Sequence, residues 1–576
     1  MKKTNFSALS TLTIVFFFWG FIAAGNSIFI PFCKSYFHLD QFQSQLVDYA
    51  FYGAYYVGAL LLFLFSSIKG KDLIGSWGYK KSIVYGLLFS AFGASAMIMA
   101  VYGNTFSGML IGFFLVALGF SLQQTAANPF AISLGDEKTG STRVNFAGGI
   151  NSFGTMIGPL IVAFALFGSS AAVTDQMIAE LDLIKVILLY IVIGSLFIIS
   201  ALIFGFSKSV PQGINEESTR PAPKAIKSLL VMTGLLIIMF APVFNSYNTS
   251  KAKKIAKYEM QLEKIKKDDF TGTMSIAALE NEVIRLKKPL ETERMLWLSG
   301  ALLTVLGTLI FANFSSKKND HGWGAMKYPQ LVFGMLAIFV YVGVEVAIGS
   351  NLGELLKQER FGGYEASGIA PFISMYWGSL MIGRWAGAVN AFNLKNSTRN
   401  ILTAVVPILA FLLILLSNII AQKDVSQLYW YILCVFVQIA AFYYVGSNPI
   451  KSLFIFGLLG IVSMLIGMSS SGIIAIYAFL SGGLFCSILW PCIFSLSIAG
   501  LGSHTSQGSA FLIMMILGGG IIPPLQGKLA DIVGIQQSYF VAVMCFAYLA
   551  LFALIVRRAL NKQGIQLEET EISAGH

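Results

Sequence analysis

The chain has 576 residues, of which 56% are hydrophobic and 12% are charged, and its mean hydropathy is +0.73. A soluble domain averages about 25% charged residues, so this composition excludes a soluble globular protein and indicates an all-α polytopic membrane protein. The formal net charge of +11 does not indicate a nucleic-acid partner, because the lysines and arginines fall mostly in short segments between apolar runs. Such a distribution orients membrane proteins, with the basic loops in the cytoplasm.

Apolar runs of about 20 residues, long enough to cross a bilayer, form two sets of six. The first set begins near residues 8, 41, 79, 105, 143 and 184, and the second near residues 328, 367, 450, 473, 507 and 536. Four further runs form two pairs, Leu229–Phe244 with Leu296–Phe311 and Ile401–Ala421 with Leu428–Tyr444. Because each pair returns the chain to the side it left, the sequence predicts about sixteen spans with both termini in the cytoplasm.

This order of runs is the layout of a major facilitator transporter, in which two six-span halves enclose a binding site near the midplane. The predicted parts are an N-terminal half (1–206), a central cytoplasmic linker with the first inserted transmembrane pair (207–327), a C-terminal half with the second inserted pair at about 401–444 (328–558) and a cytoplasmic tail (559–576).

A charged stretch at about 248–294 separates the two runs of the first inserted pair, and this topology puts it outside the cell. Apolar residues recur there at helical spacing on two arms: Ile255, Tyr258, Leu262 and Ile265, then Ile276, Leu279, Val283 and Leu286. The spacing predicts a helical hairpin with a narrow apolar seam on each arm. Either the hairpin is a spacer that packs only on itself, or it has a partner-docking or oligomerising role, with a partner whose identity the sequence leaves unknown.

Carboxamides occupy several apolar spans, where each buried amide without a partner costs roughly 1 to 3 kcal/mol. Gln124 and Asn128 lie four residues apart on one helix face, and Pro129 then removes a backbone hydrogen bond. Asn26 lies in the first span, and Asn145 and Asn151 lie in the fifth. These uncharged donors and acceptors suit a neutral polyhydroxylated ligand, although amides also join membrane helices to one another.

Aromatic and acidic residues complete the candidate site. Tyr341, Trp377 and Trp490 lie at similar depth and can stack against the apolar face of a sugar, although aromatic residues also serve as packing or interface anchors. A carboxylate near the bilayer centre costs about 2.5 to 3.5 kcal/mol or more and marks a functional site. Glu345, in the seventh core span, and Asp48, in the second, are therefore the candidate groups for cation coupling.

Enzyme signatures find little support in the chain. The four histidines lie in loops or the tail, and HExxH, GxSxG and GxxxxGK[ST] patterns are absent. No metal site or cofactor is expected beyond a coupling proton or sodium ion. The five cysteines lie in or beside apolar runs and form no CxxC pair.

Several motifs resemble the fucose permease family of the major facilitator superfamily, in particular its glucose and galactose permease branch. They are FFFWGFIAAGNSIFIP, LQQTAANPFAISLG, TRVNFAGGINSFG, YVGVEVAIGS, MIGRWAGA and ILWPCIFSLSIAGLGSHTSQGSAFLIMMILGGGIIPPLQGKLAD. The resemblance touches most of the twelve core spans and leaves the inserted pairs outside it. It implies hexose uptake across a bacterial inner membrane by alternating access, usually in symport with protons and sometimes with sodium.

The chain departs from the family pattern at positions that bear on coupling and gating. The family usually has Asp where this chain has Ser27, and the fucose transporter has Glu where this chain has Gln124, so both coupling acids are neutral here. The superfamily's cytoplasmic gating motif is also degraded, with Gly75 at its Asp position and Ser76 at its Arg position. Gating is assigned instead to Arg143 and Arg384.

The sequence thus predicts a secondary hexose transporter, with two alternatives left open. One is an uncoupled sugar facilitator, which the neutral Ser27 favours. The other is a non-transporting sugar sensor or scaffold, which the added spans and the degraded motif favour.

Overall fold

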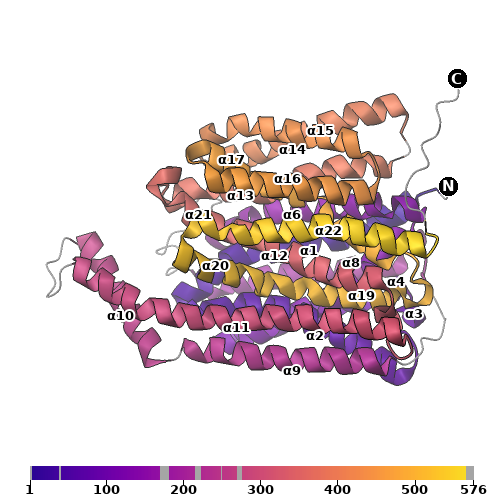
Figure 1. The fold of residues 1–576 in the computed structure, drawn as a ribbon, viewed down its shortest axis with the longest axis horizontal. Coiled ribbons are helices and arrows are strands. Elements are labelled where there is room, and N and C mark those ends of the chain that lie inside the picture. The colour runs from indigo at the N-terminus through magenta and orange to yellow at the C-terminus, as the bar shows by residue number, and fades with distance from the viewer. Residues whose placement is uncertain are drawn as a thin grey trace.

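The computed structural model describes residues 3–37, 41–168, 181–214, 222–247, 249–268, 276–392 and 394–565. Within these ranges, the side chains of residues 25–32, 34, 35, 41–46, 48, 263, 264, 266–268, 276, 277, 366 and 367 are outside the description. In the described part of the chain the regular secondary structure consists of helices without strands. Long helices run side by side along one direction (Figure 1).

The N-terminal half consists of six long helices. They are α1 (Phe6–Tyr36), α2 (Gln41–Lys69), α4 (Tyr79–Tyr102), α5 (Phe106–Ser133), α6 (Gly140–Phe167) and α8 (Leu183–Phe206), with the short α3 (Leu73–Trp77) and η1 (Glu137–Thr139) between them. α4 packs against α5 and α8, and α1 packs against α6. Glycine permits a close approach of α1 and α6, because a Cβ on Gly154 of α6 would lie 2.5 Å from the Phe17 carbonyl oxygen of α1.

The C-terminal half has the same number of core spans, but two of them are interrupted. Its helices are α12 (Pro329–Leu356), α13 (Ala366–Ala388), α16 (Pro449–Ser469), α17 (Gly472–Cys486), α18 (Leu489–Ile498), α19 (Thr505–Met514), η7 (Met515–Gly520), α20 (Ile522–Val533), α21 (Ile535–Ser538) and α22 (Phe540–Lys562). One span is divided into α17 and α18, and the next into α19, η7 and α20. Proline and glycine mark these interruptions, since they weaken or remove helix hydrogen bonds.

The two inserted pairs lie on opposite faces of the bundle (Figure 1). The first consists of α9 (Pro223–Ser246) and α11 (Ile276–Lys318), joined through α10 (Ser250–Asp268), and the second of α14 (Asn396–Ile420) and α15 (Ile432–Val445), joined through η5 (Ser426–Tyr431). α11 has 43 residues, or about 65 Å at 1.5 Å per residue. It therefore exceeds the roughly 30 Å hydrocarbon core of a bilayer, and with α10 it extends beyond the other helices at one end (Figure 1).

Fifteen described helices or helix runs are long and apolar enough to cross a membrane. The remaining predicted span corresponds to α13, a helix of 23 residues that carries Arg384 within its apolar sequence. The predicted all-helical membrane fold is confirmed. All of the predicted spans, including both inserted pairs, correspond to helices or to helix runs with a single interruption.

The hairpin formed by α10 and the start of α11 has a small apolar core of its own. Ile255, Val283 and Leu290 are buried there, and Tyr258 and Leu262 pack against them. This contact follows the seam that the spacing predicts. The sequence DDFTGT, residues 268–273 between the two arms, lies largely outside the described residues. We name the end of the bundle that carries α10 the α10 end and the opposite one, which carries α3, the α3 end (Figure 1).

Candidate functional site

A buried ion pair joins two neighbouring core spans, from the middle of α12 to the C-terminal part of α13. The Arg384 guanidinium of α13 lies 3.2 Å from the Glu345 carboxylate of α12, with side chains 11% and 13% exposed. Tyr341, one turn from Glu345, donates a hydrogen bond of 3.0 Å to that carboxylate and accepts one of 3.1 Å from Arg384. These bonds offset the desolvation cost of both charges, which an isolated carboxylate in this position would bear in full.

Arg384 also connects the two halves. It donates to the Ser152 hydroxyl of α6 at 2.8 Å and, more weakly, to the Asn151 side-chain oxygen at 3.4 Å. The next residue, Trp385, also contacts α6, since its ring nitrogen donates to the Gly149 carbonyl at 3.0 Å. A guanidinium has five donors in a fixed plane, so one side chain can hold Glu345 and α6 together.

From sequence alone, Glu345 and Arg384 receive separate roles, Glu345 in cation coupling and Arg384 in gating. Arg384 lies four residues before the end of α13 at Ala388, and its side chain reaches Glu345. The missed signal is the occurrence of one acid and one base within the apolar sequences of consecutive core spans. Unpaired charges in such segments are costly, which makes a pair the expected arrangement.

A proline frees a backbone carbonyl that becomes a further partner of Arg384. Pro491 has no N–H for the carbonyl of Ser487, four residues earlier, and the helix is interrupted there between α17 and α18. The Ser487 carbonyl instead accepts a hydrogen bond of 3.2 Å from Arg384 Nε. The broken span therefore holds one edge of the guanidinium.

The polar face of α5 makes contacts in both halves. Gln124 donates to the Tyr55 hydroxyl of α2 at 3.0 Å, and Asn128 donates to the Gln124 carbonyl on its own helix at 3.0 Å. Pro129 frees the Thr125 carbonyl, as the sequence predicts, and Ser509 of α19 donates to it at 2.7 Å. This hydrogen bond is a second polar connection between the halves.

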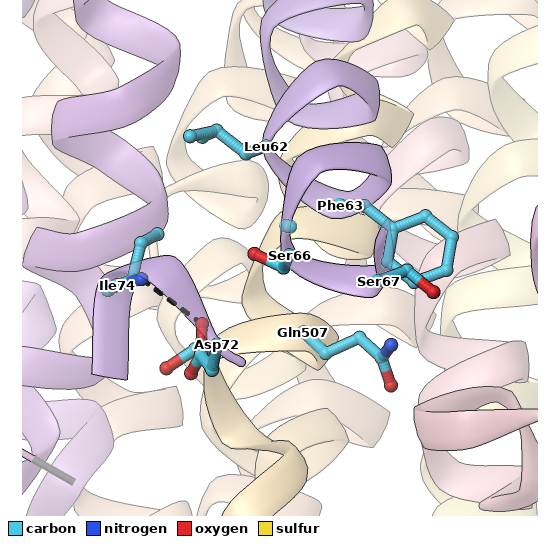
Figure 2. A pocket seen from close by; sticks show the side chains of 9 residues that line it. Leu62, Phe63, Ser66, Ser67, Asp72, Ile74 and Gln507 are labelled. Atoms are coloured by element: carbon cyan, nitrogen blue, oxygen red, sulfur yellow. Dashed lines mark hydrogen bonds between the residues drawn. The ribbon is translucent and has the colours of Figure 1, made fainter. Parts of the chain in front are cut away.

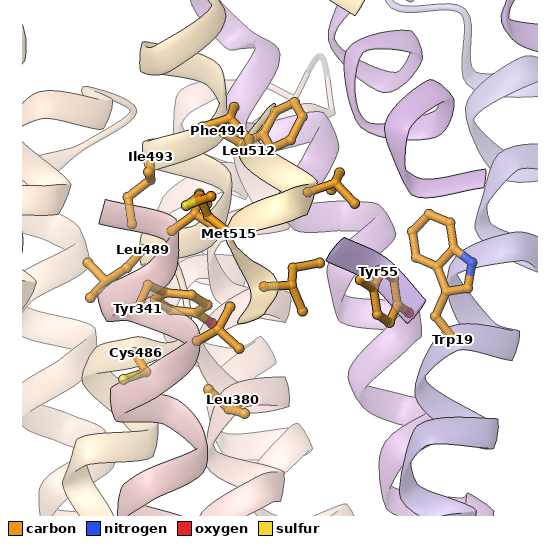
Figure 3. Packing of buried hydrophobic residues seen from close by; sticks show 14 of the residues in the cluster. Trp19, Tyr55, Tyr341, Leu380, Cys486, Leu489, Ile493, Phe494, Leu512 and Met515 are labelled. Atoms are coloured by element: carbon orange, nitrogen blue, oxygen red, sulfur yellow. The ribbon is translucent and has the colours of Figure 1, made fainter. Parts of the chain in front are cut away.

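Gln123 is not among the predicted site residues, and it is more buried than the adjacent Gln124. It accepts a hydrogen bond of 3.1 Å from the Trp19 ring nitrogen of α1 and donates to Ser90 of α4 at 3.0 Å. Figure 3 shows Trp19 and Tyr55 close together on one side, with Tyr341 among apolar side chains on the other. Gln123 thus joins three helices, which is the alternative, structural role of amides in membrane spans.

Two of the predicted amides have buried oxygens without a hydrogen-bond partner among the described residues, Asn128 Oδ1 and Asn145 Oδ1. Asn145 faces α13, because a Cβ on Gly387 would lie 2.9 Å from its side-chain nitrogen. Asn151 differs, since its nitrogen donates to the Phe16 carbonyl of α1 at 3.0 Å. Orphaned acceptors are rare in protein interiors, so Asn128 and Asn145 have capacity left for a ligand hydroxyl.

The predicted aromatic residues gather around Glu345. The Tyr341 and Trp490 rings lie 5.9 Å apart, and the Tyr376 and Trp377 rings lie 5.3 Å apart. Tyr376 donates to the backbone carbonyl of Glu345 at 2.6 Å. The structure thus brings the three predicted aromatic residues, Tyr341, Trp377 and Trp490, into the neighbourhood of the ion pair.

Arg143 makes its contacts within the N-terminal half. It is fully buried, and it donates to the carbonyls of Ala131, Ile132 and Asp136 at 2.9, 2.5 and 2.7 Å. The first two bonds satisfy carbonyls at the end of α5, which lack helix partners, and the third reaches the residue that caps η1. Two other candidates, Asn26 and Asp48, have side chains outside the described residues.

The degraded gating motif has Gly75 at its Asp position, but another carboxylate, that of Asp72, lies nearby. Asp72 caps α3 by accepting from Ile74 N at 3.1 Å, and it also accepts from the Ser506 side chain at the start of α19. Burial raises the pKa of this carboxyl above its ordinary value, and the hydrogen bonds from Ser506 and the backbone oppose the rise. Figure 2 shows Asp72 beside Ser66 of α2 and Gln507 of α19 in a small pocket at the α3 end.

Comparison with solved structures identifies this arrangement of helices. The fucose:proton symporter of Escherichia coli superposes with a TM-score of 0.59 at 20% identity, covering 96% of this chain and 99% of that structure. The chain has the major facilitator fold. A proton:xylose symporter of the same superfamily superposes with a TM-score of 0.52 at 12% identity over 95% of each chain.

Curated relatives align with nearly the whole length of this chain, while no family model matches it. A glucose/galactose transporter of Brucella abortus is 27% identical over 554 residues, 96% of this chain and 95% of the relative. The L-fucose-proton symporter of Escherichia coli is 25% identical over 550 residues, 94% of this chain and 91% of the relative. The resemblance to the fucose permease family that the sequence predicts is therefore confirmed.

Proposed function

We propose that the protein is a secondary active hexose transporter of a bacterial inner membrane, working by alternating access with both termini in the cytoplasm. The observation that carries the proposal is the buried Glu345–Arg384 pair, which lies among polar and aromatic side chains and connects the two halves of a major facilitator fold. Relatives aligned over nearly the whole chain are named glucose/galactose transporters and fucose symporters.

Sugar recognition in this proposal uses neutral donors and acceptors with aromatic surfaces. Asn128 and Asn145 offer buried oxygens that have no hydrogen-bond partner in the described part of the chain, and Gln124, Asn151 and Asn26 supply further amides. Trp377 and Trp490 supply apolar faces for the sugar ring, in the way that aromatic side chains combine an apolar body with a polar edge. A hydroxyl that replaces a missing partner gains more than one that displaces an existing hydrogen bond.

Cation coupling follows from the contacts of Glu345. A proton or sodium ion on this carboxylate would weaken its attraction to Arg384, and Arg384 holds α6 through Ser152 and Asn151. Cation binding at Glu345 is thus linked to the contacts between the halves. Asp48 remains a second proposed coupling group in the N-terminal half.

The test measures transport of glucose, galactose or fucose in proteoliposomes, at two pH values and with or without sodium. We expect the wild type to accumulate one of these sugars, and Glu345→Gln to retain sugar counterflow while losing accumulation. Because Glu345→Gln leaves Arg384 buried and unpaired, a Glu345→Gln/Arg384→Met variant serves as the charge-balanced companion. Accumulation that persists in both variants would refute the coupling role of Glu345.

The two alternatives predict different results in the same vesicles. Wild-type counterflow without accumulation would identify an uncoupled facilitator, and saturable sugar binding without flux would identify a sensor. One argument for the sensor alternative is the degraded gating motif. That argument is weaker in the structure, because Asp72 accepts a hydrogen bond from Ser506 close to the degraded positions. This contact supports a working gate at the α3 end, which the proposal assigns to the cytoplasmic side.

A further inference from the structure

The second inserted pair reaches the candidate site through one polar side chain. Gln438 lies in the middle of α15, in the sequence ILCVFVQIAAFYYV, and is fully buried. Its side-chain nitrogen donates to the Leu484 carbonyl at 2.8 Å and lies 3.3 Å from the Ser487 hydroxyl. Leu484 lies in the last turn of α17, and Ser487 lies in the interruption between α17 and α18.

This interruption creates the need for such a donor. A continuous helix would satisfy the Leu484 carbonyl with the N–H of Ile488, but α17 ends at Cys486. The Ser487 hydroxyl and the Gln438 amide donate to that carbonyl instead, the former at 2.6 Å. Within the membrane, where water is absent, a freed carbonyl must find such a partner.

The same residues fix the position of Arg384. The backbone carbonyl of Ser487 accepts from Arg384 Nε, while the Ser487 hydroxyl is held beside Gln438. A Cβ on Gly383, next to Arg384, would overlap both the Ser487 hydroxyl and the Gln438 amide. The contacts therefore run from α15 through Ser487 to the guanidinium, which in turn contacts Glu345 and Ser152.

Gln438 also carries a cost that packing alone does not explain. Its side-chain oxygen is buried without a hydrogen-bond partner among the described residues, whereas an apolar side chain of similar size would avoid that penalty. We infer that Gln438 is a positioning residue for Arg384, so that the second inserted pair forms part of the transport machinery. The inference rests on the proposed function for its transport readout, while its structural core can be tested without it.

Gln438→Met removes the donor at nearly constant volume, and Tyr431→Phe is the matched control. Tyr431 belongs to η5, which joins the same inserted pair, and it is fully buried. Its hydroxyl lies 3.1 Å from that of Ser379 on α13 and also bonds Ser481, and among the described residues it forms no hydrogen bond with Ser487. In proteoliposomes we expect Gln438→Met to lower the maximal sugar transport rate roughly tenfold, with less than about a twofold change in half-saturating concentration. Equal maximal rates for Gln438→Met and Tyr431→Phe would overturn the inference.

A double-mutant cycle on melting temperature separates this inference from the proposed function, because it requires no transport. If Gln438 acts through Arg384, Gln438→Met also weakens the Arg384–Ser152 bond, so its effect and that of Ser152→Ala combine to less than their sum. Tyr431→Phe and Ser152→Ala should add. Additive shifts for Gln438→Met and Ser152→Ala would show a purely structural role, even if the protein transports sugar.

Discussion

Prolines in this bundle free backbone carbonyls that then accept hydrogen bonds from elsewhere in the fold. Pro129 frees the Thr125 carbonyl for Ser509, and Pro491 frees the Ser487 carbonyl for Arg384. In a soluble protein water could satisfy such a carbonyl, but in the hydrocarbon region only protein groups can. Each of these prolines therefore leads to a specific contact, the first between the halves and the second at the ion pair.

The Thr125–Ser509 contact can be tested by returning the missing N–H. Ser509→Ala should destabilise the protein by about 0.5 to 1.5 kcal/mol, the range for one hydrogen bond, seen as a lower melting temperature. In a Pro129→Ala background the same substitution should have little effect, because the N–H of residue 129 then satisfies the Thr125 carbonyl. Pro242→Ala, in α9, is the control background in which Ser509→Ala should keep its full effect. A full effect in the Pro129→Ala background as well would contradict the assignment.

At the scale of elements, a buried group of charges joins the first inserted pair to a core span. Glu291 of α11 lies 2.8 Å from Arg294 and 2.5 Å from Lys528 of α20. Arg294 also donates to Ser246 of α9 at 2.7 Å and stacks over the Tyr247 ring. On its other side, α9 contacts the N-terminal half, where Tyr56 of α2 lies 2.7 Å from the Thr233 hydroxyl. The first inserted pair thus contacts both halves.

Removing the central acid of this group should be costly. Glu291→Gln leaves Arg294 and Lys528 without their carboxylate, and breaking a buried pair in this way costs about 3 to 5 kcal/mol. The expected result is a large fall in melting temperature of the purified protein. Lys287 lies on the same helix as Glu291, and Lys287→Gln breaks an exposed pair with Glu259 of α10. It should cost no more than about 1 kcal/mol. Similar shifts for the two variants would refute the role of Glu291.

At the scale of the molecule, the hairpin at the α10 end is packed separately from the transmembrane core. Its buried side chains form a cluster of their own, apart from the large cluster that extends through both halves. Since the Glu291 group lies at its base on α11, the hairpin tip can be distinguished from the part that contacts α20.

Replacing residues 252–284 with a flexible Gly/Ser linker tests what the hairpin contributes. If it is a self-packed spacer, sugar transport in proteoliposomes should stay within about twofold of wild type, because the replaced residues lie outside the large transmembrane cluster. Thermal stability should also change little while Glu291 and Arg294 remain. Loss of transport, or a change of oligomeric state by size-exclusion chromatography with light scattering, would instead indicate the partner-docking role.

The sequence determined by itself the features that depend on local hydropathy and helical spacing. Run length and composition located every span and both inserted pairs, and the family motifs identified the fold. It was also predictable that Gln124 and Asn128 share one helix face and that Pro129 frees a backbone carbonyl. Both features follow from the geometry of a single helix.

Only the tertiary structure decided which of these groups meet. The pairing of Glu345 with Arg384, the use of Gln123 between helices, the contact of Asp72 with Ser506 and the reach of Gln438 to the broken span all join residues far apart in the chain. Hydropathy specifies that a helix is buried, but it does not specify which neighbour receives a given polar side chain. That choice depends on how helices pack, where small residues such as Gly383 and Gly387 allow close approach.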